Sequence, residues 1–135
     1  MKRFILFLMI CLLLLPLCAC KPDQPYIGTW VLSARSAPHI DDLYRLFGSS
    51  LRQFGAAMTL REDGSFSYHL GLTGGSGHYT VHGDTILADY ITDNDPHPSS
   101  LTLRVVTEHS SVLLLYPYQD NGRTVEIWWE KQDAP

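Results

Sequence analysis

Cysteine is scarce in this chain of 135 residues: Cys11, Cys18 and Cys20 are the only three. The segment after Cys20 therefore has no disulfide of its own, no thiolate metal ligand and no thiol nucleophile, and a hydrophobic core must hold it together. Basic side chains are also few. The 10 lysines and arginines include Lys2 and Arg3, so 8 remain against 14 acidic side chains. This negative balance disfavours nucleic acid, which binds to basic stripes.

Long apolar runs are absent except at the N-terminus, where residues 4–15 are all apolar and follow Lys2 and Arg3. A positive start, an apolar run of about 7–15 residues and small residues before a cleavage point are typical of a secretory signal peptide. A membrane-spanning helix needs about 20 apolar residues, and Pro16 interrupts this run. We predict a signal peptide over residues 1–19; the alternative is an uncleaved anchor helix.

The end of this segment, Leu17-Cys18-Ala19-Cys20, resembles the lipobox of bacterial lipoproteins. The resemblance implies cleavage before Cys20 and acylation of its thiol with fatty acids such as palmitate. Two or more acyl chains give stable membrane residence. We therefore expect an exported protein, anchored by lipid to the bacterial cell membrane or outer membrane, with residues 20–25 as the lipidated cysteine and a short tether.

The rest of the chain, residues 26–132, has the pattern of one domain rich in strands. Between 65 and 72, apolar residues alternate with polar ones and place Phe66, Tyr68, Leu70 and Leu72 on one face, as in a half-buried strand. Eight such strands are predicted, at 26–33, 56–61, 65–72, 76–82, 85–91, 101–107, 112–118 and 124–131.

Turn signals separate most of these strands. Gly74-Gly75 is predicted as the centre of a tight hairpin turn, which would pair Leu70 with Tyr79. Gly83-Asp84, residues 108–111 and Asn121-Gly122 are predicted as further turns. Residues 92–100, which are polar and contain two prolines, are predicted as a loop.

One segment has helical spacing instead. Apolar residues recur at helical intervals between 41 and 54, with Asp41 or Asp42 as the expected N-cap, Gly55 as the stop and Gly48 as a break between two short helices. Eight short strands joined mainly by tight turns favour a closed up-and-down antiparallel barrel, because closure leaves no exposed edge. The helical segment would cover one end, and a sandwich is the alternative fold.

Two stretches resemble small lipocalin-like domains of exported bacterial lipoproteins. Gly28-Thr29-Trp30 matches the Gly-x-Trp opening of the lipocalins, and residues 60–86 (LREDGSFSYHLGLTGGSGHYTVHGDTI) resemble the middle of such domains. Residues 125–131 also resemble their last strand, which tends to end in Lys or Arg. The resemblance covers residues 26–131 and implies a barrel whose narrow end is closed by Trp30, a structural role.

Motifs for catalysis or metal binding are weak. His78 and His82 lie four residues apart on a predicted strand, about 13 Å, too far to bind one ion. Two interpretations remain for His69, His78 and His97: they are solvated side chains on the polar face, or they approach one another and form a metal site. The glycine-rich run at 72–77 lacks the lysine and the helix of a phosphate loop. We therefore expect no enzyme activity, no cofactor and no metal.

Aromatic residues point to a binding function. Tyr68, Tyr79 and Tyr90 alternate inward and would offer hydroxyls to a small apolar or aromatic ligand, with Phe47 and Phe54 against the opening. The alternative is an envelope protein-interaction module with a filled barrel, in which an exposed Trp128 contacts the partner. The predicted core consists of Trp30, Leu32, Leu60, Phe66, Tyr68, Leu70, Tyr79, Val81, Ile86, Leu103, Leu114, Ile127 and Trp129.

Overall fold

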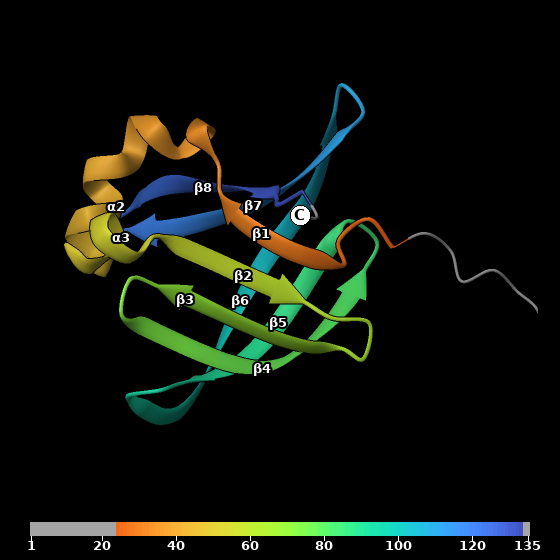
Figure 1. Cartoon of the computed structure of the whole chain (residues 1–135), viewed down its shortest axis with the longest axis horizontal. Coiled ribbons are helices and arrows are strands. Elements are labelled where there is room, and N and C mark those ends of the chain that lie inside the picture. The colour runs from red at the N-terminus through yellow and green to blue at the C-terminus, as the bar shows by residue number, and fades with distance from the viewer. Residues whose placement is uncertain (1–23, 134–135) are drawn as a thin grey trace, which may run out of the picture.

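The computed structural model describes residues 24–133. Eight antiparallel strands form a closed barrel in which each strand pairs with its neighbour in sequence and the last strand pairs with the first (Figure 1). The strands are β1 (Gly28–Leu32), β2 (Ala56–Leu60), β3 (Ser65–Leu70), β4 (Thr73–His82), β5 (Thr85–Thr92), β6 (Asp95–Glu108), β7 (Ser111–Asp120) and β8 (Arg123–Lys131). The predicted up-and-down barrel is confirmed, and the sandwich is excluded.

Tight turns explain why consecutive strands become neighbours. The turn between β6 and β7 has positive φ at His109 and Ser110, and the turn between β7 and β8 has positive φ at Asn121 and Gly122. Two consecutive residues of positive φ match the right-handed twist of the flanking strands. These turns lie where the sequence predicts them, as does the turn between β4 and β5.

The turn between β3 and β4 lies elsewhere than predicted. Leu70 pairs with Thr73, so the turn consists of Gly71 and Leu72, and the predicted centre at Gly74-Gly75 is wrong. Leu72, predicted to face inward, is 72% exposed. Gly71 has a φ of +63°, and a Cβ there would lie 2.7 Å from the backbone nitrogen of Leu51. Contact with a distant helix therefore decides which glycine forms the turn.

The predicted loop at 92–100 is also wrong, because β5 continues to Thr92 and β6 begins at Asp95. Pro96 and Pro98 lie within β6 and led to the loop prediction. They are tolerated because they lie where the pairing of β6 with β5 is irregular, between the pairs of Asp95 and Ser99, and because pairing with β7 begins only at Arg104. Proline fits a strand where a neighbouring strand does not require its missing N–H.

The helical segment begins earlier than predicted. It consists of a 3₁₀ helix, η2 (Ala34–His39), and two α-helices, α2 (Ile40–Phe47) and α3 (Ser50–Phe54). The break at Gly48 and the stop at Gly55 are confirmed. Asp41 and Asp42 are not N-caps but lie in the first turn of α2.

Ser33 and Ser36 explain the early start. The Ser33 hydroxyl accepts a hydrogen bond from the backbone N–H of Arg35 and caps η2. The Ser36 hydroxyl, fully buried, accepts from the backbone N–H of Trp128 at 2.8 Å and donates to its carbonyl at 3.2 Å. These bonds attach η2 to β8.

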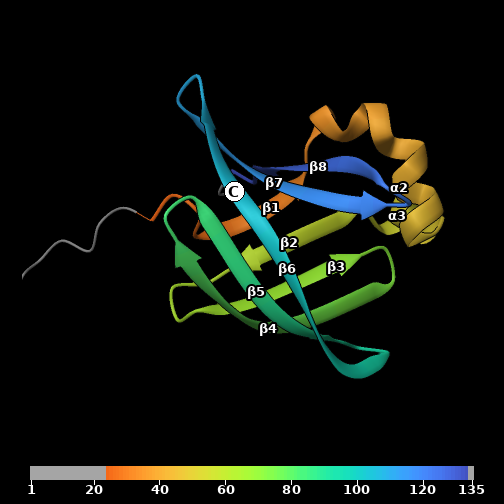
Figure 2. The ribbon, with the colours of Figure 1, turned by 180° about the vertical axis from the view of Figure 1, so that it is seen from behind.

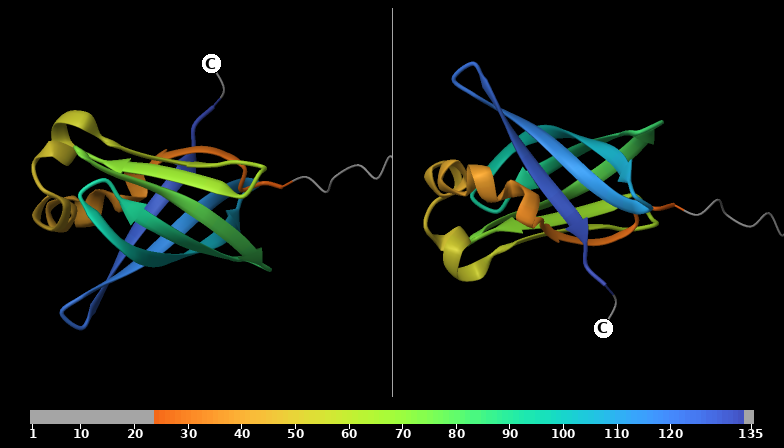
Figure 3. Two further views of the ribbon diagram at one scale, coloured as in Figure 1. Left: turned by 90° about the horizontal axis from the view of Figure 1, so that it is seen from below. Right: turned by 90° about the horizontal axis from the view of Figure 1, so that it is seen from above.

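The helices lie together at one end of the barrel, and the chain enters β1 from the opposite end (Figure 3). That far end is closed by Trp30, which is completely buried. Its indole N–H donates to the Tyr26 carbonyl at 2.9 Å, and the Lys131 ammonium lies 5.9 Å from its ring centre. The expected burial of Trp30 is confirmed.

In the part of the chain that the structure describes, no helix is long and apolar enough to span a bilayer.

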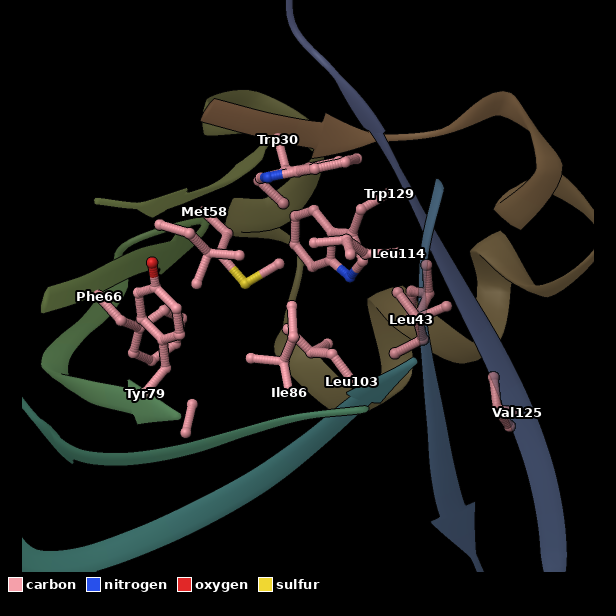
Figure 4. Close-up of a cluster of buried hydrophobic side chains, with 14 of the residues drawn as sticks. Trp30, Leu43, Met58, Phe66, Tyr79, Ile86, Leu103, Leu114, Val125 and Trp129 are labelled. Atoms are coloured by element: carbon pink, nitrogen blue, oxygen red, sulfur yellow. The ribbon is translucent and has the colours of Figure 1, made fainter. Parts of the chain in front are cut away.

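The hydrophobic core lies inside the barrel, between its two ends (Figure 4). Most of the predicted core residues are buried; Leu32, Tyr68, Leu70 and Val81 are half-buried and pack against the rest. The prediction omitted buried residues of two kinds, which are Leu43 and Leu51 on the helices and Ala56, Met58, Ala88, Leu113, Leu115 and Val125 on the strands.

The barrel wall separates between β6 and β7 near the helices. The two strands pair from Arg104 with Leu115 to Glu108 with Ser111. Beyond this ladder, β6 pairs only with β5, and the last five residues of β7 pair only with β8. Figure 2 shows β7 running toward the helices, whereas β6 diverges from it toward the turn that joins β5 and β6. Pro117, in the diverging part of β7, has no N–H to extend the ladder.

Candidate ligand-binding cavity

A cavity of about 330 Å³ lies inside the barrel, under α2 and α3. All eight strands and both α-helices contribute to its lining. No charged side chain is part of the lining. The residues that line it are Leu32, Leu43, Leu46, Phe47, Leu51, Ala56, Met58, Phe66, Tyr68, Leu70, Thr73, Tyr90, Leu101, Leu103, Tyr116, Tyr118, Ile127 and Trp129.

Glycines on β4 make room for the aromatic side of this cavity. Tyr68 pairs with Gly75, and Phe66 pairs with Gly77. A Cβ at Gly75 would lie 2.7 Å from the ring of Tyr68, so the ring occupies the space that a side chain would fill. The glycine-rich run predicted as a turn therefore serves as a strand surface on which rings pack.

Five aromatic contacts order this side of the cavity, one of them an edge contact between Phe66 and Tyr90 at 6.2 Å. Phe66 and Tyr68 are stacked with ring centres 5.8 Å apart, and Tyr68 meets Tyr90 edge to face at 5.2 Å. Tyr118 makes edge contacts with Tyr116 and with Phe47 of α2, both at 6.0 Å. Such pairs stabilise by about 0.5–1.5 kcal/mol beyond the area they bury, so these rings are held in defined positions.

The tyrosine hydroxyls at the cavity donate no hydrogen bond to another group of the described protein. Of the described tyrosines, only Tyr79 donates a hydroxyl hydrogen bond to another protein group. The hydroxyls of Tyr68, Tyr90, Tyr116 and Tyr118 are not fully covered by protein atoms. They are therefore accessible to a molecule in or at the cavity.

Burial raises the pKa of two of these phenols. It raises the pKa of Tyr68 to about 12, with further contributions from Tyr90, Asp93 and Tyr116. The pKa of Tyr116 is also raised, first by burial and then by Tyr90 and Tyr118. A phenolic hydroxyl can donate one hydrogen bond.

Trp129 contributes a buried polar atom without a partner. Among the described residues, its indole nitrogen is the one fully buried side-chain nitrogen or oxygen that lacks a hydrogen bond. Figure 4 shows this nitrogen turned toward the barrel interior, on the side of Leu103. An unpaired buried donor costs about 1–3 kcal/mol, so the interior is not optimised for stability alone.

The predicted ligand-binding residues separate into two groups. Tyr68, Tyr90 and Phe47 line the cavity. Tyr79 and Phe54 do not: the Tyr79 hydroxyl donates to the Arg61 carbonyl at 2.5 Å at the closed end, and Phe54 is 49% exposed on α3. Tyr79 also meets Tyr26 edge to face at 6.1 Å, which makes it part of the plug around Trp30.

Sequence reasoning missed Tyr116 and Tyr118 as lining residues. The signal was available, because both share the inward face of their strand with Leu114, which was predicted in the core. The helical stripe that includes Leu43, Leu46 and Leu51 was predicted to cover one end of the sheet and, for a ligand-binding barrel, to act as a lid; these three residues line the cavity.

Polar contacts attach the helical roof to the barrel on one side. Arg45 of α2 forms ion pairs with Asp120 at 2.6 Å and with Asp42 at 3.2 Å, and Asp42 also pairs with Arg123 at 3.2 Å. The hydrogen bond from Arg45, together with Arg123 and His39, lowers the pKa of Asp42. These four residues, Asp42, Arg45, Asp120 and Arg123, are called the clasp below.

Backbone contacts attach the roof on the other side. Gly71 N–H donates to the Gly55 carbonyl at 2.8 Å, and Leu72 N–H donates to the Ser50 hydroxyl at 3.4 Å. The roof is thus attached to the β7–β8 turn and to the β3–β4 turn.

The remaining candidates lie outside the cavity. His69 pairs with Gly74 and His78 with Ser65 along the outer surface, and His97 hydrogen-bonds to Asp95. Within residues 24–133, no three His, Cys, Asp or Glu side chains are grouped to hold a metal ion.

Trp128 does not form an exposed patch. It is half-buried, with the Arg35 guanidinium 5.2 Å from its ring centre and its indole N–H donating to Glu126 at 3.2 Å. Arg35 in turn pairs with Glu108.

The fold and the site define a closed eight-stranded antiparallel barrel with an uncharged, largely apolar cavity beneath a helical roof. No protein-family model, curated protein or solved structure matches the chain. Its function must therefore be inferred from its own residues.

Proposed function

We propose that this protein is a lipid-anchored bacterial lipoprotein whose lipocalin-like barrel binds a small apolar or aromatic compound. The observation that carries the proposal is the cavity of about 330 Å³. Pockets for small molecules range from about 300 to 1,000 Å³ and are mostly apolar with a few polar groups. This cavity has that size and that lining.

A barrel that serves only as a packed interaction module has less support. Protein interiors are close-packed, with few voids larger than a water molecule. The clustered rings, the roof and the glycines of β4 instead leave a space that packing has not closed. Trp128, the candidate contact of an interaction module, is covered by Arg35.

The anchoring part of the proposal depends on residues 1–23, which lie outside the described residues. Its support is the resemblance of Leu17–Cys20 to a lipobox and the apolar run before it. Because the chain enters the barrel at the end opposite the helices, an anchor at Cys20 would leave the roofed end farthest from the membrane (Figure 3).

Binding of the neutral fluorescent probe N-phenyl-1-naphthylamine tests the binding proposal. We expect its fluorescence to rise on addition of the protein, and the Leu101→Trp variant to lose most of this signal, because Leu101 lines the cavity and tryptophan would fill it. The matched control is Leu87→Trp. Leu87 lies on β5, points outward and is 43% exposed, so this variant should bind the probe like the wild type.

Circular dichroism and a denaturation curve for each variant separate a filled cavity from an unfolded protein. Absence of probe binding by the folded wild type, or equal binding by folded Leu101→Trp, contradicts the proposal.

A further inference from the structure

Most of the polar groups at the cavity are phenolic hydroxyls, beside which lies the unpaired indole N–H of Trp129. Apart from Thr73, the hydroxyls among the lining residues belong to Tyr68, Tyr90, Tyr116 and Tyr118. They come from β3, β5 and β7. The helical roof contributes only leucines and Phe47. A bound molecule would therefore meet hydrogen-bonding groups on the barrel wall and an apolar surface under the roof.

The lining excludes charged ligands. An ion in this cavity would lose its hydration without an opposite charge to replace it, which is costly in an apolar environment. A cation could instead rest on aromatic faces. Here, however, the faces of Phe66 and Tyr68 stack on each other, and Tyr68 and Tyr90 are packed edge to face. Each of these contacts uses part of a ring surface, and the lining offers no opposite charge, so a neutral molecule fits better.

The phenols favour a ligand that accepts hydrogen bonds. Each phenolic hydroxyl brings to the cavity a donor that has no protein acceptor. Burial has already removed part of their hydration, so the loss on binding is reduced. A carbonyl oxygen, which has two lone pairs, can accept from two donors at once.

We propose that the cavity recognises a neutral ring compound bearing a carbonyl-type acceptor, which receives hydrogen bonds from the hydroxyls of Tyr68, Tyr90 and Tyr116. This inference rests on the proposed binding function and names the ligand class. The rings of Phe66 and Tyr68 offer edges for the ligand ring, and the leucines of the roof cover it.

The test uses two probes with the same ring skeleton, benzophenone and diphenylmethane, which differ in one carbonyl group. Each is titrated against the complex of the protein with N-phenyl-1-naphthylamine, and the displaced fluorescence gives its affinity. The ketone is better hydrated in water, so the affinities themselves do not report on the hydroxyls. The readout is the ratio of ketone to hydrocarbon affinity, compared between the wild type and its variants.

Three variants each remove a single hydroxyl: Tyr68→Phe, Tyr90→Phe and Tyr116→Phe. We expect the ratio to fall about fivefold in the variant that loses the main donor, the effect of one ordinary hydrogen bond. The matched control is Tyr44→Phe. Tyr44 lies on α2 against Arg52, outside the cavity lining, and its loss should leave the ratio unchanged.

The outcomes separate the two proposals. If both probes displace the fluorophore and the ratio stays the same in all three variants, the acceptor inference is wrong and the binding function stands. Tighter binding of benzyltrimethylammonium than of benzophenone also overturns it, in favour of a cation. If the wild type binds neither the fluorophore nor either probe, both proposals fail.

Discussion

At the closed end of the barrel, one side chain combines complete burial, a hydrogen bond and a cation contact. Trp30 is buried by strands on both sides, donates to the Tyr26 carbonyl and lies under Lys131. Tyr79 and Tyr26 pack beside it. These contacts pack the end of the barrel around Trp30, whereas the cavity lies under the helices.

The Trp30→Ala variant should therefore lose about 3–5 kcal/mol of unfolding free energy, because a large buried ring is removed and a cavity remains. Chemical denaturation followed by circular dichroism measures this. Trp128→Ala is the matched control, and its loss should be clearly smaller because Trp128 is only half-buried. Equal losses in the two variants would show that Trp30 does not close the barrel.

Single residues could be assigned to the inner or outer face from sequence, but not to a depth along the barrel. Alternation predicted Tyr68, Tyr79 and Tyr90 to point inward, and all three do. Tyr79 nevertheless lies in the plug and not at the cavity. Depth depends on the stagger between strands, and a period of two carries no information about stagger.

Among the elements, the helical segment shows what local signals can and cannot establish. Its apolar spacing, the break at Gly48 and the stop at Gly55 predicted two short helices correctly. The start was missed because η2 depends on hydrogen bonds from Ser36 to Trp128, which is 92 residues away. The β3–β4 turn was misplaced for a similar reason, since α3 approaches Gly71.

The clasp makes the roof sensitive to charge. In Asp42→Asn, Arg45 and Arg123 lose a shared carboxylate, so we expect faster hydrogen exchange of the α2 amides and more rapid release of the fluorescent probe. Salt at about 1 M should have a similar effect, because it screens exposed charges beyond about 3 Å.

Acid should weaken the clasp as well. The pKa of Asp42 is lowered in the folded protein, so its contribution is complete above the ordinary aspartate value of about 3.9 and is lost as the pH falls through the lower folded value. The matched control is Asp41→Asn, since Asp41 is exposed on the same turn. Unchanged α2 exchange in Asp42→Asn would mean that other contacts hold the roof.

For the whole molecule, the architecture followed from the number of strands and the shortness of their turns, which together leave few topologies besides an up-and-down barrel. The cavity could not be predicted from the number of strands and the length of their turns. Its volume is the small difference between the space that the barrel encloses and the side chains that fill it. Strand pattern and composition constrain neither volume closely enough. In addition, Gly74 and Gly75 were predicted to form a turn, so the space that glycines leave on β4 was not recognised.

Substitution of Cys20, the predicted lipid anchor, tests directly whether the protein is attached to a membrane. The Cys20→Ser variant should lose acylation and appear in the soluble fraction after cell lysis, whereas the wild type stays with membranes, because two or more acyl chains are needed for stable residence. Cys18→Ser is the control and should remain membrane-bound. Membrane retention of Cys20→Ser would contradict the lipoprotein proposal.

The separation of β6 from β7 has a consequence for self-association. Where these strands part, each has one edge without a neighbour in the described barrel, and such edges can add strands from other molecules. Pro96 and Pro98 stand in the unpaired stretch of β6, and Pro117 in that of β7. Each proline removes a donor that an incoming strand would need. In the proposed membrane-anchored state, the molecules would meet often and at high local concentration, and there the three prolines would disfavour pairing between the free strand edges of neighbouring barrels.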